Sequence, residues 1–475
     1  MADQKRDFAE AEEPIPFSEV SGSEHAETTN VSWTPEEEKR VLWKIDLLLL
    51  PNIWIMYLLS YMDRTNIGNA KIAGMADDLH LSSGQYSIML VVFFVGYVIF
   101  EPPSNMILVR VRPSRYLPTL MICWGILTCV MAAVKDFKHL VALRVIIGLF
   151  EAGFAPGVLL LISSWYKKEE QSRRFAIFIS AAILSGAFGG LLAGAISGGL
   201  EGAHGIRGWR WLFIVEGVAT VGWAFIAIFI LPDFPLTSKR LTPRERQIAS
   251  ARLREDGVTV RNADGGNVGK RQSFWLALKD WRTWGFILGY MVIVGSSTLS
   301  YFYPTLVRGL GYTSVVQAQY MTVPIYAVAF VCTAVTGFFA DKVPQWRGVI
   351  IAGWLTVSMI TAIIVCAVYN FTARYALLII MAAGLWSSNA LSLSFASSTL
   401  GSMEPETRAV ALALINAMGN LAQIYGAYLF PSDNAPKYLI GFGTISGLLG
   451  FGVAVYLVMH ILVRRYERSK QAITA

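Results

Sequence analysis

The sequence predicts an all-α membrane protein with twelve transmembrane helices arranged as two pseudo-symmetric six-helix bundles. Of its 475 residues, 54% are hydrophobic and only 15% are charged, whereas a soluble domain has about 25% charged residues. Apolar segments recur along the chain, each of about 20 residues, the length that crosses roughly 30 Å of hydrocarbon. Motifs at the ends of these segments repeat between the two halves of the chain. Together, these observations indicate a multi-pass membrane protein.

The expected spans follow a polar N-terminal region. Residues 1–40 are predicted to form a disordered acidic tail and then a surface helix, which begins at a capping box, Thr34-Pro-Glu-Glu37. No apolar stretch typical of a cleavable signal peptide follows the start of the chain. The twelve expected spans are 44–66, 85–108, 116–134, 139–162, 174–199, 210–231, 284–305, 316–340, 348–369, 374–400, 407–429 and 438–463.

The spans divide into an N-terminal bundle (41–231) and a C-terminal bundle (284–463). Between them lies a polar linker (232–283), in which a second capping box starts at Thr242 and a flexible Gly- and Asn-rich stretch follows. Most of the 40 lysines and arginines lie in segments that this topology places in the cytoplasm, together with both termini, including the tail 464–475. The net charge of +7 is therefore attributed to membrane topology and not to a nucleic-acid partner.

The two halves carry similar basic residues after the second span of each bundle. Arg110 and Arg115 occur in the first half, and Lys342 and Arg347 follow 232 residues later in the second. A repeat of six helices with a basic loop at this place is typical of transporters. Their halves rock about a binding site near the bilayer midplane.

The informative charged residues within the expected spans are Asp63 and Arg64 in the first, and Arg144 and Glu151 in the fourth. Glu101 and Glu216 also lie in expected spans and are interpreted as structural. A charge in a spanning helix costs at least about 2.5–3.5 kcal/mol, so it usually faces a cavity or a partner. A guanidinium suits a carboxylate, and a buried carboxyl can take up and release a proton. We therefore expect an anion and a proton to bind here; two packing ion pairs are the alternative. Adjacent helical residues project about 100° apart, so Asp63 and Arg64 need not share one contact.

Uncharged polar residues in the expected spans are weaker candidates for substrate binding. They are Asn66 in the first span, Tyr301 and Tyr303 before Pro304 in the seventh, and Asn389 in the tenth. A helix break at Pro304 could direct the two tyrosine hydroxyls inward. Aromatic packing and interhelical hydrogen bonding are the alternative explanations.

Motifs of other site classes are missing from the sequence. The four cysteines lie in apolar segments without metal-ligand or disulfide spacing, and the five histidines are scattered. Catalytic triads, metalloprotease motifs and phosphate-binding glycine loops are not found. We therefore expect no enzyme, no metal and no cofactor apart from a proton gradient.

The residues around these charges carry a specific resemblance. The stretches YMDRTNIGNAK (61–71) and RVIIGLFEAGFAPG (144–157), together with FFVGYVIFEPPSN (93–105) and GWRWLFIVEG (208–217), resemble the anion:cation symporter family of the major facilitator superfamily, in its fungal allantoate/nicotinate/pantothenate permease branch. The resemblance extends through nearly the whole membrane part. It implies the major facilitator fold, a substrate carboxylate bound by Arg64 with Arg144, and proton transfer by Glu151 and Asp63.

One departure from the superfamily concerns its inner-loop gating motif, G-x-x-x-D-[RK]-x-x-x-R. In the second half the motif is intact, with Asp341, Lys342 and Arg347. In the first half Val109 stands where the aspartate would be, and Arg110 remains. We expect these four polar residues to act in gating, with a weaker or differently built ion pair in the first half.

The expected function is the import of a small organic anion, such as a vitamin or a nitrogen-source acid, by proton symport with alternating access. The expected setting is the lipid bilayer of a fungal plasma membrane, and the expected state is a monomer. The expected seventh span has no core arginine, which favours a monocarboxylate. Export of an organic acid or secondary metabolite, and a nutrient sensor without transport, are the alternatives. The sequence does not identify the anion.

Overall fold

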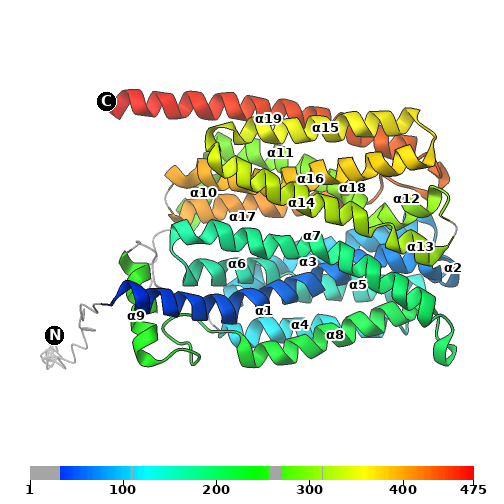
Figure 1. The fold of residues 1–475 in the computed structure, drawn as a ribbon, viewed down its shortest axis with the longest axis horizontal. Coiled ribbons are helices and arrows are strands. Elements are labelled where there is room, and N and C mark those ends of the chain that lie inside the picture. The colour runs from blue at the N-terminus through cyan, green and yellow to red at the C-terminus, as the bar shows by residue number, and fades with distance from the viewer. Residues whose placement is uncertain (1–32, 109–110, 256–269, 313, 404, 475) are drawn as a thin grey trace, which may run out of the picture.

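The computed structural model describes residues 33–474, apart from 109–110, 256–269, 313 and 404. The described residues form helices and no strands. The long helices run side by side along the longest axis of the molecule (Figure 1). We call the end of the bundle at which α9 (Pro243–Glu255) and α10 (Lys270–Lys279) lie the linker end. We call the other end of the bundle the opposite end.

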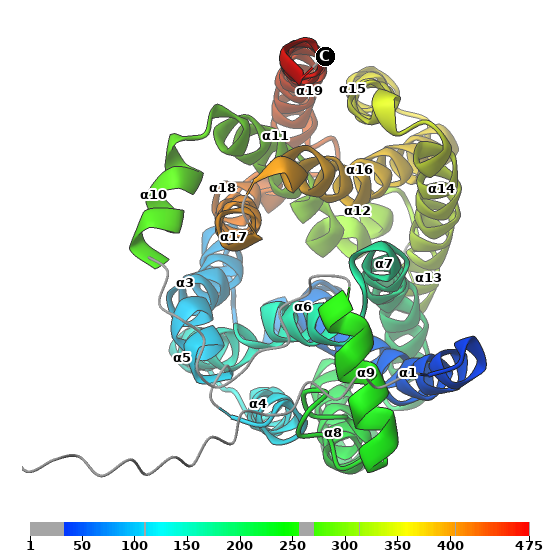
Figure 2. The ribbon, with the colours of Figure 1, turned by 90° about the vertical axis from the view of Figure 1, so that its left-hand side faces the viewer.

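The first half of the chain forms one group of helices, in which α1 packs against α7 and α8, α3 packs against α5, and α4 packs against α8. Figure 2 shows this group on one side of the molecule, viewed from the linker end. Its elements are α1 (Pro35–Ala70), η1 (Lys71–Met75), α2 (Ala76–Asp78), α3 (Ser83–Leu108), α4 (Pro113–Met131), α5 (Phe137–Glu151), α6 (Phe154–Trp165), α7 (Lys168–Gly199), η2 (Ala203–Gly205) and α8 (Gly208–Ile230).

The second half forms the other group, in which α15 packs against α16 and α19, α14 packs against α16, and α11 packs against α17. Its elements are α11 (Trp281–Ser297), η3 (Thr298–Phe302), α12 (Tyr303–Gly309), α13 (Val315–Tyr320), α14 (Val323–Lys342), η4 (Pro344–Trp346), α15 (Arg347–Ala367), α16 (Phe371–Thr399), η5 (Leu400–Ser402), α17 (Pro405–Leu421), α18 (Gln423–Gly426), η6 (Ser432–Asn434) and α19 (Leu439–Thr474).

Among the described residues, eleven helical segments are long and apolar enough to cross a membrane. They correspond to eleven of the twelve expected spans. The remaining one, 407–429, is formed by α17 and α18, whose apolar part, Val410–Gly426, is shorter. The α-helix is interrupted at Ala422, between these two elements. The predicted all-α fold is confirmed, with the eleventh span the shortest of the set.

Both predicted capping boxes are formed. Thr34 Oγ1 accepts a hydrogen bond from the Glu37 amide at 3.2 Å, and Glu37 Oε2 accepts one from the Thr34 amide at 3.0 Å. The helix that begins there continues to Ala70, so the expected surface helix and the first span are one element. Thr242 and Glu245 make the same reciprocal bonds at the start of α9. The Gly- and Asn-rich stretch between α9 and α10 lies outside the described residues.

Two expected spans are broken near the bundle centre. The fourth consists of α5 and α6, which are separated between Glu151 and Phe154. A Cβ atom at Gly153 would collide with Ser104 of α3, so the helices approach closely at this break. The seventh changes from α11 to the 3-10 helix η3 after Ser297, and α12 begins at Tyr303. The break expected at Pro304 therefore occurs, but it starts several residues earlier.

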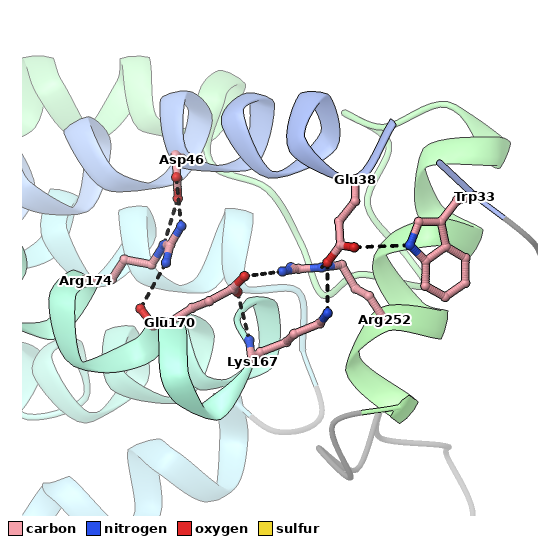
Figure 3. Close-up of polar contacts among 7 residues, drawn as sticks. All are labelled: Trp33, Glu38, Asp46, Lys167, Glu170, Arg174 and Arg252. Carbon is pink, nitrogen blue, oxygen red and sulfur yellow. Dashed lines mark hydrogen bonds and ion pairs between the residues drawn. The ribbon is translucent and has the colours of Figure 1, made fainter. Parts of the chain in front are cut away.

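The linker helix α9 is fixed to the first half by a buried ion-pair network (Figure 3). The Arg252 side chain is fully buried, with Nε 2.9 Å from Glu38 Oε1 of α1 and Nη2 paired with Glu170 of α7. Lys167 Nζ also lies 2.9 Å from Glu38 Oε1. Breaking one partner of a buried ion pair costs about 3–5 kcal/mol. We infer that α9 moves as part of the first half.

The two halves meet through hydrogen bonds toward the opposite end. Gly68 of α1 allows the closest approach, because a Cβ atom there would collide with the Tyr301 carbonyl. The side-chain donors and their backbone acceptors are Ser87 and Ala427 (2.7 Å), Arg308 and Ile72 (3.0 Å), Tyr86 and Tyr301 (3.3 Å), and Gln319 and Asn69 (3.5 Å). The halves are therefore closed against each other at this end.

Candidate functional site

A buried ion pair lies at the centre of the first half. Arg64 of α1 places Nε 2.6 Å from Glu151 Oε1, at the end of α5, and both side chains are buried. Ser60, one turn before Arg64, donates a hydrogen bond to the same carboxylate oxygen. Glu151 Oε2 and Arg64 Nη2 are buried without a hydrogen-bond partner. The pair is thus only partly satisfied by the protein.

Three aromatic rings surround the Arg64 guanidinium. Its Cζ lies 4.8 Å from the ring centre of Tyr97, 5.2 Å from that of Tyr61 and 5.4 Å from that of Phe93. Such rings attract a cation by about 0.5–1 kcal/mol at exposed sites and by about 2 kcal/mol when water is excluded. These rings pack around the guanidinium and so restrict its position.

Arg144 is a second buried guanidinium, and it has no ion pair with any residue that the structure describes. Its Cζ lies 4.9 Å from the Phe93 ring centre, and its Nε is buried without a partner. A buried charge without a counter-charge is costly. Arg144 therefore carries a buried charge without a direct ion-pair partner, which an anion could supply.

Asp63 faces the other side of α1. Its Oδ2 accepts hydrogen bonds from Trp124 Nε1 of α4 and Thr220 Oγ1 of α8, both at 3.2 Å. Arg64 faces Glu151 of α5 instead. Asp63 and Arg64 therefore contact different helices, as expected for adjacent residues on a helix. The helix α1 presents two separate polar faces.

The structure places two of the other candidate residues near these groups. Tyr301 of η3 belongs to the second half, and its hydroxyl donates to Gln423 Oε1 at 3.1 Å. The charges of Arg64 and Arg144 act on this hydroxyl across the boundary between the halves. Asn66 is fully buried one turn after Asp63, and its Oδ1 accepts a hydrogen bond from Asn69.

The remaining two candidate residues, Tyr303 and Asn389, lie among neutral side chains of the second half. The Tyr303 ring packs edge-on against Tyr326, with the ring centres 5.5 Å apart. Asn389 of α16 is half-buried, and its side chain lies near the hydroxyl of Tyr290 on α11. Their contacts are thus with neutral groups of the second half.

The candidate gating residues lie at the linker end of the second half. Arg347 Nη2 is 3.1 Å from Asp341 Oδ1, and the Lys342 ammonium is 4.3 Å from the ring centre of Phe338. These contacts are all within the second half. Arg110 lies outside the described residues. A gating contact between the halves stays a prediction.

The described part of the chain contains no group of three or more His, Cys, Asp or Glu residues placed to hold a metal ion. The charged groups are instead buried among aromatic and aliphatic side chains. An arrangement of this kind can exchange protons and bind an organic anion.

Comparison with known proteins assigns the family. A model of the Major Facilitator Superfamily matches residues 53–427. The chain belongs to this superfamily. It is therefore a multi-pass membrane transporter and not an enzyme, in agreement with the sequence analysis.

Relatives within the superfamily match most of the chain. The MFS transporter prlL of a fungal species (strain NRRL 50135) is 38% identical over 438 residues, which cover 89% of this chain and 86% of that protein. The MFS-type transporter cnsO of Penicillium expansum is 33% identical, with 91% and 85% covered. The high-affinity nicotinic acid transporter of Saccharomyces cerevisiae is 30% identical over 440 residues, with 92% and 80% covered.

A solved structure shares the superfamily fold. It is a bacterial homologue of the human lysosomal transporter Spinster, described in an inward-facing and unoccupied conformation. The TM-score is 0.69, and the match covers 91% of this chain and 99% of that one at 17% identity. At this identity the likeness concerns the fold alone.

The sequence analysis of this superfamily member missed several residues that contact the charges. Ser60 could have been found, because it lies four residues before Arg64 and thus on the same helical face. Phe93 and Tyr97 have the same spacing on α3. Trp124 and Thr220 carry no comparable signal, because each is one apolar or small residue within a long apolar run.

Proposed function

We propose that this chain couples the transport of a small organic anion to protons, with Arg64, Arg144 and Glu151 as the central residues. The observation that carries the proposal is the buried Arg64–Glu151 pair next to the unpaired Arg144. Two guanidiniums and one carboxylate suit a carboxylate ligand, which guanidinium binds in a bidentate manner.

Coupling follows from competition for Arg64. An anion that binds Arg64 displaces Glu151, whose charge would then be buried and unpaired at a cost of several kcal/mol. A proton on Glu151 removes that cost, so the anion and the proton bind together. Ser60 remains available to hydrogen-bond the neutral acid. Without substrate, Glu151 loses the proton and closes the pair again.

The substrate proposed is a monocarboxylate with a polar or aromatic body. Aromatic rings line Arg64 and Arg144, and the second half faces them with the hydroxyl of Tyr301 and the amide of Gln423. Among the described residues of this region, Arg64 and Arg144 are the buried arginines, and the Lys71 ammonium is directed at the ring of Tyr86. The similarity to a nicotinic acid transporter supports the same class.

The direction proposed is import across the plasma membrane, with the linker end and both termini in the cytoplasm. The halves are closed at the opposite end, and in the proposed orientation this closed end faces outward. Rocking of the halves about the arginines would expose the site alternately. Asp341, Lys342 and Arg347 would act in closing the linker end, and a single chain would suffice.

The test uses the purified full-length protein in proteoliposomes with an imposed pH gradient. Labelled nicotinate is the first probe, followed by a panel of labelled mono- and dicarboxylates. We expect accumulation of a monocarboxylate that follows the gradient. In Glu151→Gln we expect gradient-driven accumulation to be lost, while exchange of labelled for unlabelled anion continues.

The matched control is Asp77→Asn, because Asp77 is an exposed carboxylate at the opposite end. It should behave like the wild type. The proposal is wrong if Glu151→Gln retains gradient-driven accumulation, or if no carboxylate of the panel accumulates. Reversing the gradient across the same vesicles distinguishes import from export.

A further inference from the structure

A second pair of buried carboxyls lies on the face of α1 that is turned away from Glu151. It consists of Asp63 and Glu216 of α8, which are 5% and 1% exposed. Asp63 Oδ1 and both oxygens of Glu216 are buried without a hydrogen-bond partner. Among the described residues, no lysine, arginine or histidine lies within ion-pair distance of either carboxyl.

The packing of α1 on α8 brings these groups together. Thr220 donates to Asp63, and Glu216 lies one turn before Thr220 on α8. Because the two helices run in opposite directions, the turn of Glu216 lies against the next turn of α1, which contains Asn66. The Asn66 carboxamide faces Glu216. It is 0% exposed, and its Nδ2 makes no hydrogen bond of normal geometry.

Two negative charges at this place would repel each other without compensation. Glu216 lies one helical turn from Thr220, which bonds to Asp63, so the two carboxyls occupy neighbouring turns of the contact between α1 and α8. Two carboxylates that share a buried site do not both ionise. An ionised carboxylate without a partner costs several kcal/mol in the interior. Asp63 accepts hydrogen bonds from Trp124 and Thr220, whereas Glu216 accepts none. The proton is therefore better placed on Glu216.

The other titratable groups around Asp63 and Glu216 do not supply a positive charge that would let both carboxyls ionise. Arg144 and Glu151 of α5 act on Asp63 with opposite signs. On α4, Cys129 faces the backbone of α8 next to Glu216. The Lys71 ammonium of η1 is directed at the Tyr86 ring, 4.2 Å from its centre. Beyond its linker end, α7 has no titratable side chain.

We propose that Asp63 and Glu216 form a second proton-binding site, separated from the anion site by α1, in which Glu216 is the neutral acid. The ligand of this site is a proton. The inference deepens the proposed function, because it adds Glu216 as a proton-binding residue and links the far face of α1 to pH. Since Asp63 and Arg64 are neighbours on one helix, a movement of α1 changes the surroundings of both sites.

The test is infrared difference spectroscopy of the purified full-length protein, titrated with pH in the absence of any anion. A protonated carboxyl has a C=O band that a carboxylate lacks. We expect the spectrum of Glu216→Gln to lose one component of this band. Glu151→Gln should differ from the wild type in another component, and the double variant should lose both.

A second variant keeps the test decisive if Glu216→Gln does not fold. Asp63→Asn retains Glu216, and its C=O band should persist at a shifted frequency because its neighbour has changed. The proposal is wrong if Glu216→Gln has the wild-type carboxyl band at every pH, or if Asp63→Asn leaves the band unshifted. The experiment contains no transported anion. The carboxyl band can therefore contradict the role of Glu216 while gradient-driven uptake is still observed, and uptake can be absent while the band still shows a protonated Glu216.

Discussion

The two halves of this transporter share a fold but differ in the chemistry of their interiors. In the first half, Asp63, Arg64, Arg144, Glu151 and Glu216 are buried at mid-bundle. Among the described residues, the second half presents hydroxyl and amide groups at the same depth. They are the side chains of Tyr290, Tyr301, Asn389 and Gln423.

The difference indicates a division of work between the halves. Charge–charge interactions are strong and long-ranged in a low-dielectric interior, whereas hydrogen bonds between neutral groups are short-ranged and directional. The first half is thus suited to bind charge and to exchange protons. The second half is suited to recognise the uncharged part of a substrate. Four further variants test this division, from the largest expected effect to the smallest.

Arg144→Gln should have the largest effect, because it removes an unpaired cation of the charged half. We expect uptake at low anion concentration to fall at least about 30-fold, which corresponds to about 2 kcal/mol for a lost charge partner. Thermal stability should not fall, since no protein ion pair is broken and a costly unpaired buried charge is removed. The effect on transport is measured by uptake of labelled nicotinate or of the best substrate in the panel. The effect on stability is measured by the thermal midpoint.

Two comparisons make this result specific. Lys135→Gln removes an exposed cation and should leave uptake unchanged. Arg64→Gln should lower uptake and stability together, because it strands Glu151 at a cost of about 3–5 kcal/mol. Wild-type uptake in Arg144→Gln would show that the unpaired cation does not serve the anion.

Gly68→Ala tests the contact at which the halves meet. The added Cβ would collide with the Tyr301 carbonyl, and overpacking typically costs about 1–3 kcal/mol. We expect uptake to fall about 10-fold, in line with that cost, because the opposite end no longer closes fully. A cysteine introduced at Ser87, which contacts Ala427, should then react faster with a membrane-impermeant maleimide. Gly84→Ala is the matched control, since nothing lies near its Cβ; equal labelling in both variants would contradict the expectation.

Tyr301→Phe tests the neutral half. It removes the hydroxyl that donates to Gln423, and such interhelical bonds contribute about 0.6–1.7 kcal/mol in membranes. We expect KM to rise about 3- to 10-fold, with accumulation still driven by the gradient. Tyr303→Phe is the control, because Tyr303 packs against Tyr326 away from the arginines. An equal or larger effect of the control would remove Tyr301 from the substrate site.

Glu245→Gln tests whether α9 is bound to the first half and should have the smallest effect. Burial opposes ionisation of Glu245, but the Lys44 ammonium at 2.8 Å and the Thr242 amide outweigh it and lower its pKa. A folded-state pKa below the unfolded value means that this stabilisation is present above about pH 4.3 and is lost as the pH falls.

The wild type should therefore lose more stability than Glu245→Gln between neutral and acidic pH. The pair is partly exposed, so the difference should not exceed about 1 kcal/mol. Thermal midpoints across this pH range measure it. Glu255→Gln, at the exposed end of α9, is the control and should keep the wild-type acid sensitivity. If the thermal midpoints of the wild type and Glu245→Gln fall in parallel as the pH is lowered, the Lys44–Glu245 ion pair does not stabilise the contact of α9 with the first half.

Much of the fold and part of the site could be predicted from local patterns. The capping boxes at Thr34 and Thr242 need only residues within one helical turn. The membrane spans need only an apolar run of sufficient length. Arg64 and Glu151 stood out because a charge is rare in such a run. Each of these signals is contained in a short stretch of sequence.

The break near Glu151 and the role of Glu216 could not be predicted in the same way. The break occurs where Gly153 meets Ser104 of another helix. The sequence around Glu216 favours a structural role, because Asp63 and Asn66, which lie on the helix that packs against it, are about 150 residues away along the chain. Such contacts depend on how helices pack and not on the residues beside them.

The sequence by itself thus determined the class of protein, its membrane spans and which residues carry buried charge. These properties follow from hydropathy and from the high cost of charge in hydrocarbon. Only the tertiary structure decided which charges are paired. It joined Arg64 to Glu151, left Arg144 without an ion pair among the described residues, and turned Asp63 toward Trp124 and Thr220 on the other face of α1. The reason is that pairing depends on distances between helices, which the packing of the whole bundle sets.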